Sequence, residues 1–363
     1  MNIHEKIEKM KSIENSILTF IDKESDIEES QQDLIQLIID SNILTNKYDL
    51  KTFLYLLSKI LNNHYRYPNF FSKIEKIFKH FESSIKKNIS NNEIFKIFLK
   101  CPRFILYLYS ENVIDINEEI INLIKPMTFV YLFPESAIEY KMIEKLPENF
   151  EVKQKIGEND DLISEMIRND KIDEFISYVK QNDYSLKNMI KPSYFETNQF
   201  LMKKKFTTLI EYASFFGSTQ IFRYLYKNGV ELKSSLWLYA IHSDNPEMIR
   251  LLEENNVHPP NNSYETCIKE AIKCHHNDIV NYIQSNFIVE DKKNIDFENY
   301  YNENIHSYCF HYFNFVFFPQ DITNKINFFY ACKYDYFEIV KYFLKTMSID
   351  IKSKIILKLG MFK

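Results

Sequence analysis

Alanine is rare in this chain, and the places where it occurs restrict the fold more than any other feature of the sequence. Only five stand in 363 residues: Ala137, Ala213, Ala240, Ala271 and Ala331. The last four share their surroundings, because a Gln, Glu or Asp follows each seven positions later and apolar residues follow at eight, nine and twelve positions. Ala213, for example, precedes Ile221, Phe222 and Leu225. Apolar residues at these offsets share one side of a helix, so the pattern predicts a short helix with a small buried residue, a tight turn and a second amphipathic helix.

The starts and the spacing of these helix pairs indicate a repeat. A hydroxyl five positions before an alanine can cap a helix by accepting a bond from a backbone N–H. The expected caps are Thr208, Ser235 and Thr266, and the fourth copy has Ile326 in that place. A weaker copy follows Asp161, with Met166 in the alanine position. Counted from position 166 to position 331, successive copies are 47, 27, 31 and 60 residues apart. A single pair cannot bury its apolar face, so the copies are expected to stack, and the longest gap has room for a degenerate copy in the aromatic stretch 300–318.

The best copy resembles a known family. Residues 208–217 read TLIEYASFFG, and IFRYL at 221–225 and NGV at 228–230 follow. This sequence resembles an ankyrin repeat, and 235–241 and 270–280 extend the likeness, more specifically to the large ankyrin families of trichomonad-type protists. The usual Thr-Pro-Leu-His start is replaced by Thr208-Leu209-Ile210-Glu211, and the spacing of 27 is shorter than the usual length of about 33 residues.

The resemblance implies an all-α chain with an ankyrin-repeat α-solenoid of about four to six degenerate repeats behind a helical N-terminal region. We expect the helical N-terminal domain at 1–150, the ankyrin-repeat domain at 155–350 with its best repeats at 207–290, and a tail at 351–363. The first region shows helical periodicity without the repeat, as at Phe53, Leu54 and Leu57. The polar segment 148–161 lacks an apolar stripe and is the expected boundary.

Composition excludes several classes of function. Only 4 Gly and 10 Pro leave few positions for hairpin turns or phosphate-binding loops, which agrees with an all-α fold. Lys and Arg total 45 against 50 Asp and Glu, so nucleic acid is not an expected partner. An odd set of 5 Cys without CxxC spacing fits a reducing compartment. The first residues lack an apolar signal segment and no apolar run reaches membrane-spanning length, so we expect a cytoplasmic chain without membrane insertion.

Two groups of Cys and His raise the question of a metal site. The first is Cys274-His275-His276 with Cys267, and the second comprises His306, Cys309 and His311. A zinc site here would need four N or S ligands that converge tetrahedrally. The alternative is structural, since the two histidines fall where ankyrin repeats have their inner turn and Cys267 falls among core positions. We expect no metal, no cofactor and no catalytic constellation, and a metal-dependent enzyme using these clusters is the least favoured alternative.

The resemblance implies a partner-binding surface. In ankyrin stacks, partners contact the hairpin tips and the ends of the first helices, on the concave face. The corresponding residues here are Phe215, Phe216, His242, Ser243, Lys273, Cys274, Lys333 and Tyr334. Adjacent phenylalanines would form an apolar anchor, unless they are buried against the N-terminal domain or the long 166–213 insertion. We therefore expect a non-enzymatic scaffold that binds a protein partner on this face; an adaptor or inhibitor that recruits machinery through its N-terminal domain is the alternative.

Overall fold

The chain folds almost entirely into helices. A computed structural model describes residues 3–23, 28–204, 206–288, 295–320, 322 and 324–346. No strand occurs in these ranges, and the extended pairing consists of an isolated antiparallel bridge between Met189 and Thr208. The all-α prediction is therefore confirmed. The predicted tail at 351–363 lies outside the described residues.

The helices form two compact units. Of the described residues, those within 1–59, 66–89 and after 288 form the terminal unit, and those within 60–65 and 90–288 form the central unit. The helices of the terminal unit are α1 (Ile3–Asp22), α2 (Glu28–Asp40), η1 (Ile43–Thr45), α3 (Lys47–Asn63, to residue 59), α4 (Phe70–Asn88), α20 (Ile295–Tyr312), α21 (Lys325–Lys333) and α22 (Phe337–Thr346). The central unit contains α5 (Asn91–Phe98), α6 (Pro102–Ser110), α7 (Glu118–Leu123), α8 (Pro126–Leu132), α9 (Pro134–Glu139), α10 (Phe150–Ile156), α11 (Leu162–Arg168), α12 (Ile172–Gln181), α13 (Gln199–Lys203), α14 (Leu209–Phe216), α15 (Thr219–Lys227), α16 (Leu236–His242), α17 (Pro246–Glu254), η2 (Pro260–Asn262), α18 (Glu265–Cys274) and α19 (Asn277–Phe287).

The terminal unit joins the first helices of the chain to the last described ones. The ammonium of Lys6 on α1 lies 2.7 Å from the carboxylate of Asp49 and 3.0 Å from that of Glu338 at the start of α22. The backbone N–H of Phe315 donates to the buried carboxylate of Glu14, 2.6 Å away. Residues more than 300 positions apart therefore belong to one core.

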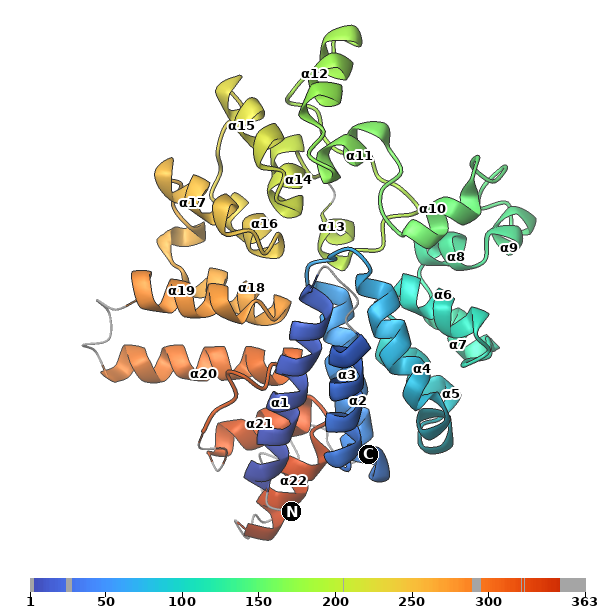
Figure 1. The fold of residues 1–363 in the computed structure, drawn as a ribbon, viewed down its shortest axis with the longest axis vertical. Helices are drawn as coiled ribbons and strands as arrows, with labels where there is room; N and C mark the ends of the chain where they lie inside the picture. Colours follow the sequence, from blue (N-terminus) through green and yellow to red (C-terminus); the bar gives the residue numbers. More distant parts are fainter. Residues whose placement is uncertain are drawn as a thin grey trace. The chain divides into compact units, whose positions relative to one another are not determined.

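The central unit contains four successive helix pairs, and each alanine of the repeat is at the centre of its packing. Figure 1 shows α11/α12, α14/α15, α16/α17 and α18/α19 in this order, and the first helices α11, α14, α16 and α18 pack on one another in succession. Ala213, Ala240 and Ala271 have no exposed surface, and the apolar residues at offsets 8, 9 and 12 are buried as predicted. Side chains of alanine size let α14, α16 and α18 approach one another closely, whereas α11 has the larger Met166 at the corresponding position.

The turns between paired helices repeat as closely as the side chains do. In each copy the residue four positions after the alanine, or after Met166, has positive φ, ending the first helix in a left-handed cap. These residues are Asp170, Gly217, Asp244, His275 and Asp335. In four of the five copies the next backbone N–H donates to the carbonyl of the alanine-position residue, as Ser218 does to Ala213 at 2.9 Å. The repeat predicted from the sequence is thus also a repeat of backbone conformation. It extends to the last copy, α21/α22, which contains Ala331.

The predicted caps have mixed outcomes. Thr208 caps α14 with a full capping box, in which its hydroxyl accepts the Glu211 N–H and the Glu211 carboxylate accepts the Thr208 N–H. Ser235 precedes α16 but makes no cap bond: its backbone is already helical instead of extended, and its hydroxyl donates to Glu211. Thr266 lies inside α18, which begins one residue earlier, so that prediction was wrong.

The compact units do not divide the chain at the predicted boundary of 148–161. Residues 90–156 belong with the helix pairs of the central unit, and the last pair, α21/α22, belongs to the terminal unit. Periodicity shows which face of a helix is apolar but not which other face covers it, so domain membership was not readable from the pattern. The aromatic stretch 300–318 contains the end of the long helix α20 and the loop after it, without a second helix before α21.

Candidate functional site

The eight predicted partner-binding residues differ in exposure. Four are buried: Phe215, His242, Ser243 and Cys274. Phe216, Lys273 and Tyr334 are half-buried, and Lys333 is exposed. Lys333 and Tyr334 belong to the terminal unit, and the other six belong to the ends of α14, α16 and α18 in the central unit. We call the surface at these three helix ends the helix-end face.

A short helix of the chain itself covers part of the helix-end face, and His64 and Tyr65 contact the Cys274 and Phe216 carbonyls on the same face. Phe200 of α13 packs its ring on His242 at 4.1 Å, on Tyr239 at 4.9 Å and on Phe215 at 5.7 Å between ring centroids. The sequence left open whether Phe215 is buried against the N-terminal domain or against the 166–213 insertion. Because α13 lies in that insertion, Phe215 is buried against the insertion. Phe200 was not among the predicted site residues, and the signal that could have found it is the 47-residue gap, which is longer than one helix pair needs.

A buried polar network joins the ends of α16 and α18. His242 Nε2 lies 2.7 Å from Glu270 Oε1, and the ammonium of Lys273 donates to the same oxygen. Burial alone would raise the pKa of Glu270, but the hydrogen bond from His242 and the nearby Lys273 outweigh it and lower the pKa to about 2. Burial lowers the pKa of His242 despite this carboxylate. Glu270 was not among the predicted site residues, although its position four residues before Cys274 puts both on one face of α18.

The same network contains the potential metal ligands that the structure brings together. Among the described residues, ligand atoms of His242, Glu270 and Cys274 lie within 4.8 Å of one another. This set shares only Cys274 with the predicted cluster; His276 instead has its Nδ1 2.7 Å from the carbonyl of Ile241. N, O and S donors suit zinc. Oxygen Oε1 of Glu270 is already contacted by His242 and Lys273, so a cation on this oxygen would compete with both.

The three side chains also lie in the sequence found in a catalytic triad, with Cys274 in the place of the nucleophile, His242 in that of the base and Glu270 in that of the orienting carboxylate. Cys274 Sγ lies 3.4 Å from His242 Nδ1, and His242 continues to Glu270. A thiol nucleophile has to be accessible and partly deprotonated. Cys274 has no exposed surface, and burial raises its pKa well above the usual value. The arrangement therefore suits a packed polar core better than covalent catalysis.

A groove lies at the N-terminal ends of α14 and α16, beside the loops that lead into these two helices. Its volume is about 380 Å³, and we call it the loop-edge groove. Its apolar floor includes the buried Ile210 and Leu236, and charged side chains of both signs stand at its rim. The lining residues are Leu186, Lys187, Met189, Thr208, Ile210, Glu211, Gly229, Val230, Glu231, Lys233 and Leu236.

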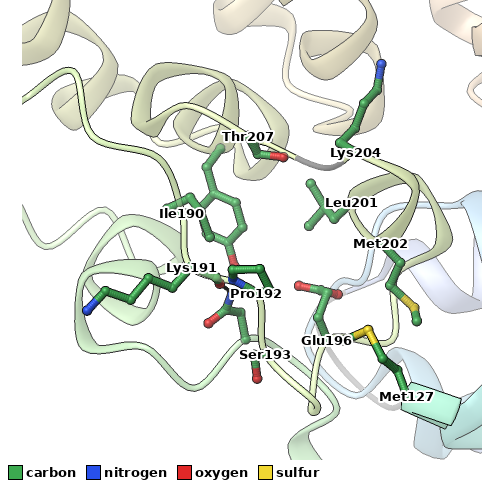
Figure 2. A pocket seen from close by; sticks show the side chains of 12 residues that line it. Met127, Ile190, Lys191, Pro192, Ser193, Glu196, Leu201, Met202, Lys204 and Thr207 are labelled. Atoms are coloured by element: carbon green, nitrogen blue, oxygen red, sulfur yellow. Dashed lines mark hydrogen bonds between the residues drawn. The ribbon is translucent and has the colours of Figure 1, made fainter.

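A smaller cavity of about 230 Å³ lies beneath the insertion, between α13 and α8. Figure 2 shows the Glu196 carboxylate among the apolar side chains of Leu201, Met202 and Met127, while Lys191 and Lys204 extend away from it. One oxygen of Glu196 accepts the Asn198 N–H at 2.7 Å, next to the cap of α13. The cavity is therefore built by the same insertion that covers the helix-end face.

Comparisons with protein-family models, with curated proteins and with solved structures gave no match to this chain. Within the described residues, no helix combines the length and the apolar character needed to cross a membrane.

Proposed function

We propose that the chain is a non-enzymatic interaction scaffold of the ankyrin type, whose stacked helix pairs bind a protein partner. The observation that carries the proposal is the loop-edge groove, which spans two consecutive pairs at the ends where ankyrin stacks present their hairpin tips. The repeat and the insertion build this groove together: α14, α16 and the loop before α16 form most of it, and Leu186, Lys187 and Met189 of the insertion line the rest.

The chemistry of the groove favours a peptide segment over a small polar metabolite. An apolar floor surrounded by charged side chains has the composition of protein interfaces, which combine a hydrophobic centre with a polar rim. The rim carries the acidic Glu211 and Glu231 and the basic Lys187 and Lys233, so its charges can complement those of a peptide segment with both signs of charge. Met189 contributes an exposed apolar side chain at 46% exposure. Exposed methionine is common at surfaces that accept varied apolar partners.

The experiment is co-purification of the tagged full-length chain from its native lysate, compared with two variants. Met189→Asp places a charge in the groove, whereas Tyr226→Asp places one on α15, at a tyrosine with similar exposure (43%) that does not line the groove. We expect Met189→Asp to lose specific partners and Tyr226→Asp to keep them, with unchanged helicity in both. Partners that survive Met189→Asp would refute the assignment to the groove.

A further inference from the structure

The helix α13 does not belong to any of the helix pairs. It has five residues, Gln199–Lys203, and lies in the insertion that lengthens the first gap of the repeat to 47 residues. A helix this short has little stability of its own. Its position is therefore held by contacts: the Asn198 side chain caps its N-terminus, and Phe200 and Leu201 are buried.

The surface beneath Phe200 is a slot for an aromatic ring. Phe215 stacks nearly parallel to the Phe200 ring at 16°, Tyr239 meets it edge to face at 82°, and His242 lies at 4.1 Å. These are the favourable arrangements of aromatic pairs. Only 8% of Phe200 is exposed, so the ring fills the slot.

Two ammonium groups complete the slot. Lys273 Nζ lies 5.2 Å and Lys204 Nζ 5.4 Å from the centre of the Phe200 ring, within the range of cation–π attraction. Lys204 follows α13, whereas Lys273 belongs to α18 and is fixed by its bond to Glu270. The slot therefore keeps one of its cations, and all three aromatic walls, when α13 leaves.

We propose that the helix-end face is a second binding surface, that Phe200 occupies it within the chain, and that a protein segment with an aromatic residue followed by an aliphatic one displaces α13 to bind there. The chemistry of the ligand is taken from Phe200-Leu201, the pair seated on the face. The inference extends the proposed function to a second surface of the same stack. It also explains why the predicted anchor Phe215 is apolar at a helix end and yet buried.

A peptide with the sequence of residues 197–204, labelled with fluorescein, tests the slot directly. In the wild-type full chain α13 competes from within the chain at high effective concentration, so the peptide is excluded. In the Phe200→Ala full chain the slot is vacated. Fluorescence anisotropy is expected to show at least tenfold tighter binding to Phe200→Ala than to wild type, and a peptide with alanine at position 200 is expected to bind neither.

Equal binding to both chains, or no binding to a Phe200→Ala chain with native helicity and native Trp237 fluorescence, would overturn the proposal. A second variant, with residues 199–203 replaced by Gly-Ser-Gly-Ser-Gly, removes the whole helix while keeping the length of the insertion. If both variants lose the native Trp237 signal, α13 is part of the fold and the proposal is wrong. The peptide assay uses no lysate, so its outcome is independent of the co-purification test of the loop-edge groove.

Discussion

The stability of the central unit is expected to fall in mildly acidic solution because of one buried histidine. His276 has its Nδ1 2.7 Å from the carbonyl of Ile241, and its Nε2 accepts the Tyr65 N–H at 3.4 Å. This pair of partners fits the neutral ring with the proton on Nδ1, since a proton on Nε2 would face an N–H donor. Burial, with the neighbouring His64 ring 4.7 Å away, holds the pKa of His276 well below its usual 6.5.

The sign and size of the effect follow from linkage. The folded pKa is depressed, so as pH falls below 6.5 the unfolded chain takes up the proton first and the folded state loses relative stability. Between pH 7.5 and 5.5, a histidine that stays neutral in the folded state and has an ordinary pKa when unfolded costs about 1.4 kcal/mol. Burial also lowers the pKa of His242, which adds to the loss in wild type.

The assay is urea unfolding at pH 7.5 and 5.5, followed by fluorescence of Trp237. This residue is the single tryptophan of the chain and is fully buried in α16, so its signal reports the helix pairs. His276→Asn removes the titrating group while its amide can still donate to Ile241. We expect the loss of stability between the two pH values to be about 1.4 kcal/mol smaller in His276→Asn than in wild type. The control His258→Gln changes an exposed histidine and should match wild type; equal losses in wild type and His276→Asn would refute the reasoning.

Three further predictions concern packing, capping and thiol access. Ala240→Leu overfills the contact between neighbouring first helices and should lower the free energy of unfolding by about 1–3 kcal/mol or more in the same urea assay; a neutral effect would contradict the role given to the alanines. Thr208→Ala removes a capping-box hydroxyl and should cost about 1 kcal/mol, whereas Ser235→Ala should cost clearly less because Ser235 makes no cap bond. Of the five thiols, Cys332 is only half-buried and the other four are buried, so a thiol reagent should label Cys332 first in the native chain, and Cys332→Ser should remove the fast phase. A fast phase that persists in that variant would show that another cysteine is accessible.

The part of the fold that the sequence predicts is the part determined locally. An alanine and the apolar residues at offsets 8, 9 and 12 lie within about twenty residues, and they predict one helix, the turn after it and the buried face of the second helix. Ala213, Ala240 and Ala271 are buried as this pattern predicts. Contacts between distant segments leave no such pattern. Nothing near Glu14 indicates that it accepts a bond from Phe315, so the joining of the chain's first and last helices was not readable.

The candidate site was predicted in the same uneven way. The helix ends at Phe215, His242 and Cys274 do lie together, because the repeat brings the ends of successive first helices side by side. Phe200 covers Phe215 and His242, and its segment lacks the repeat pattern that would show where it packs. Cys274 is contacted by His64, whose Nδ1 lies 2.8 Å from the Cys274 carbonyl. The anomalous gap showed that an insertion exists but not where it packs, and the position of α13 had to come from the structure.

The turn residues show how one copy of the repeat is coupled to the next. Asp170 has φ of 47° at a position where glycine would carry no steric cost, yet its carboxylate accepts the N–H groups of Gln220 and Ile221 in the first turn of α15, at 3.1 and 3.0 Å. Asp170→Gly would therefore relieve a strain of about 1 kcal/mol and lose two bonds to a helix N-terminus worth about 1 kcal/mol each. The second effect is larger, so the substitution should lower the free energy of unfolding by about 1 kcal/mol in the Trp237 assay. Stabilisation by Asp170→Gly would mean that these bonds contribute little, and that the pairs are coupled by apolar packing alone.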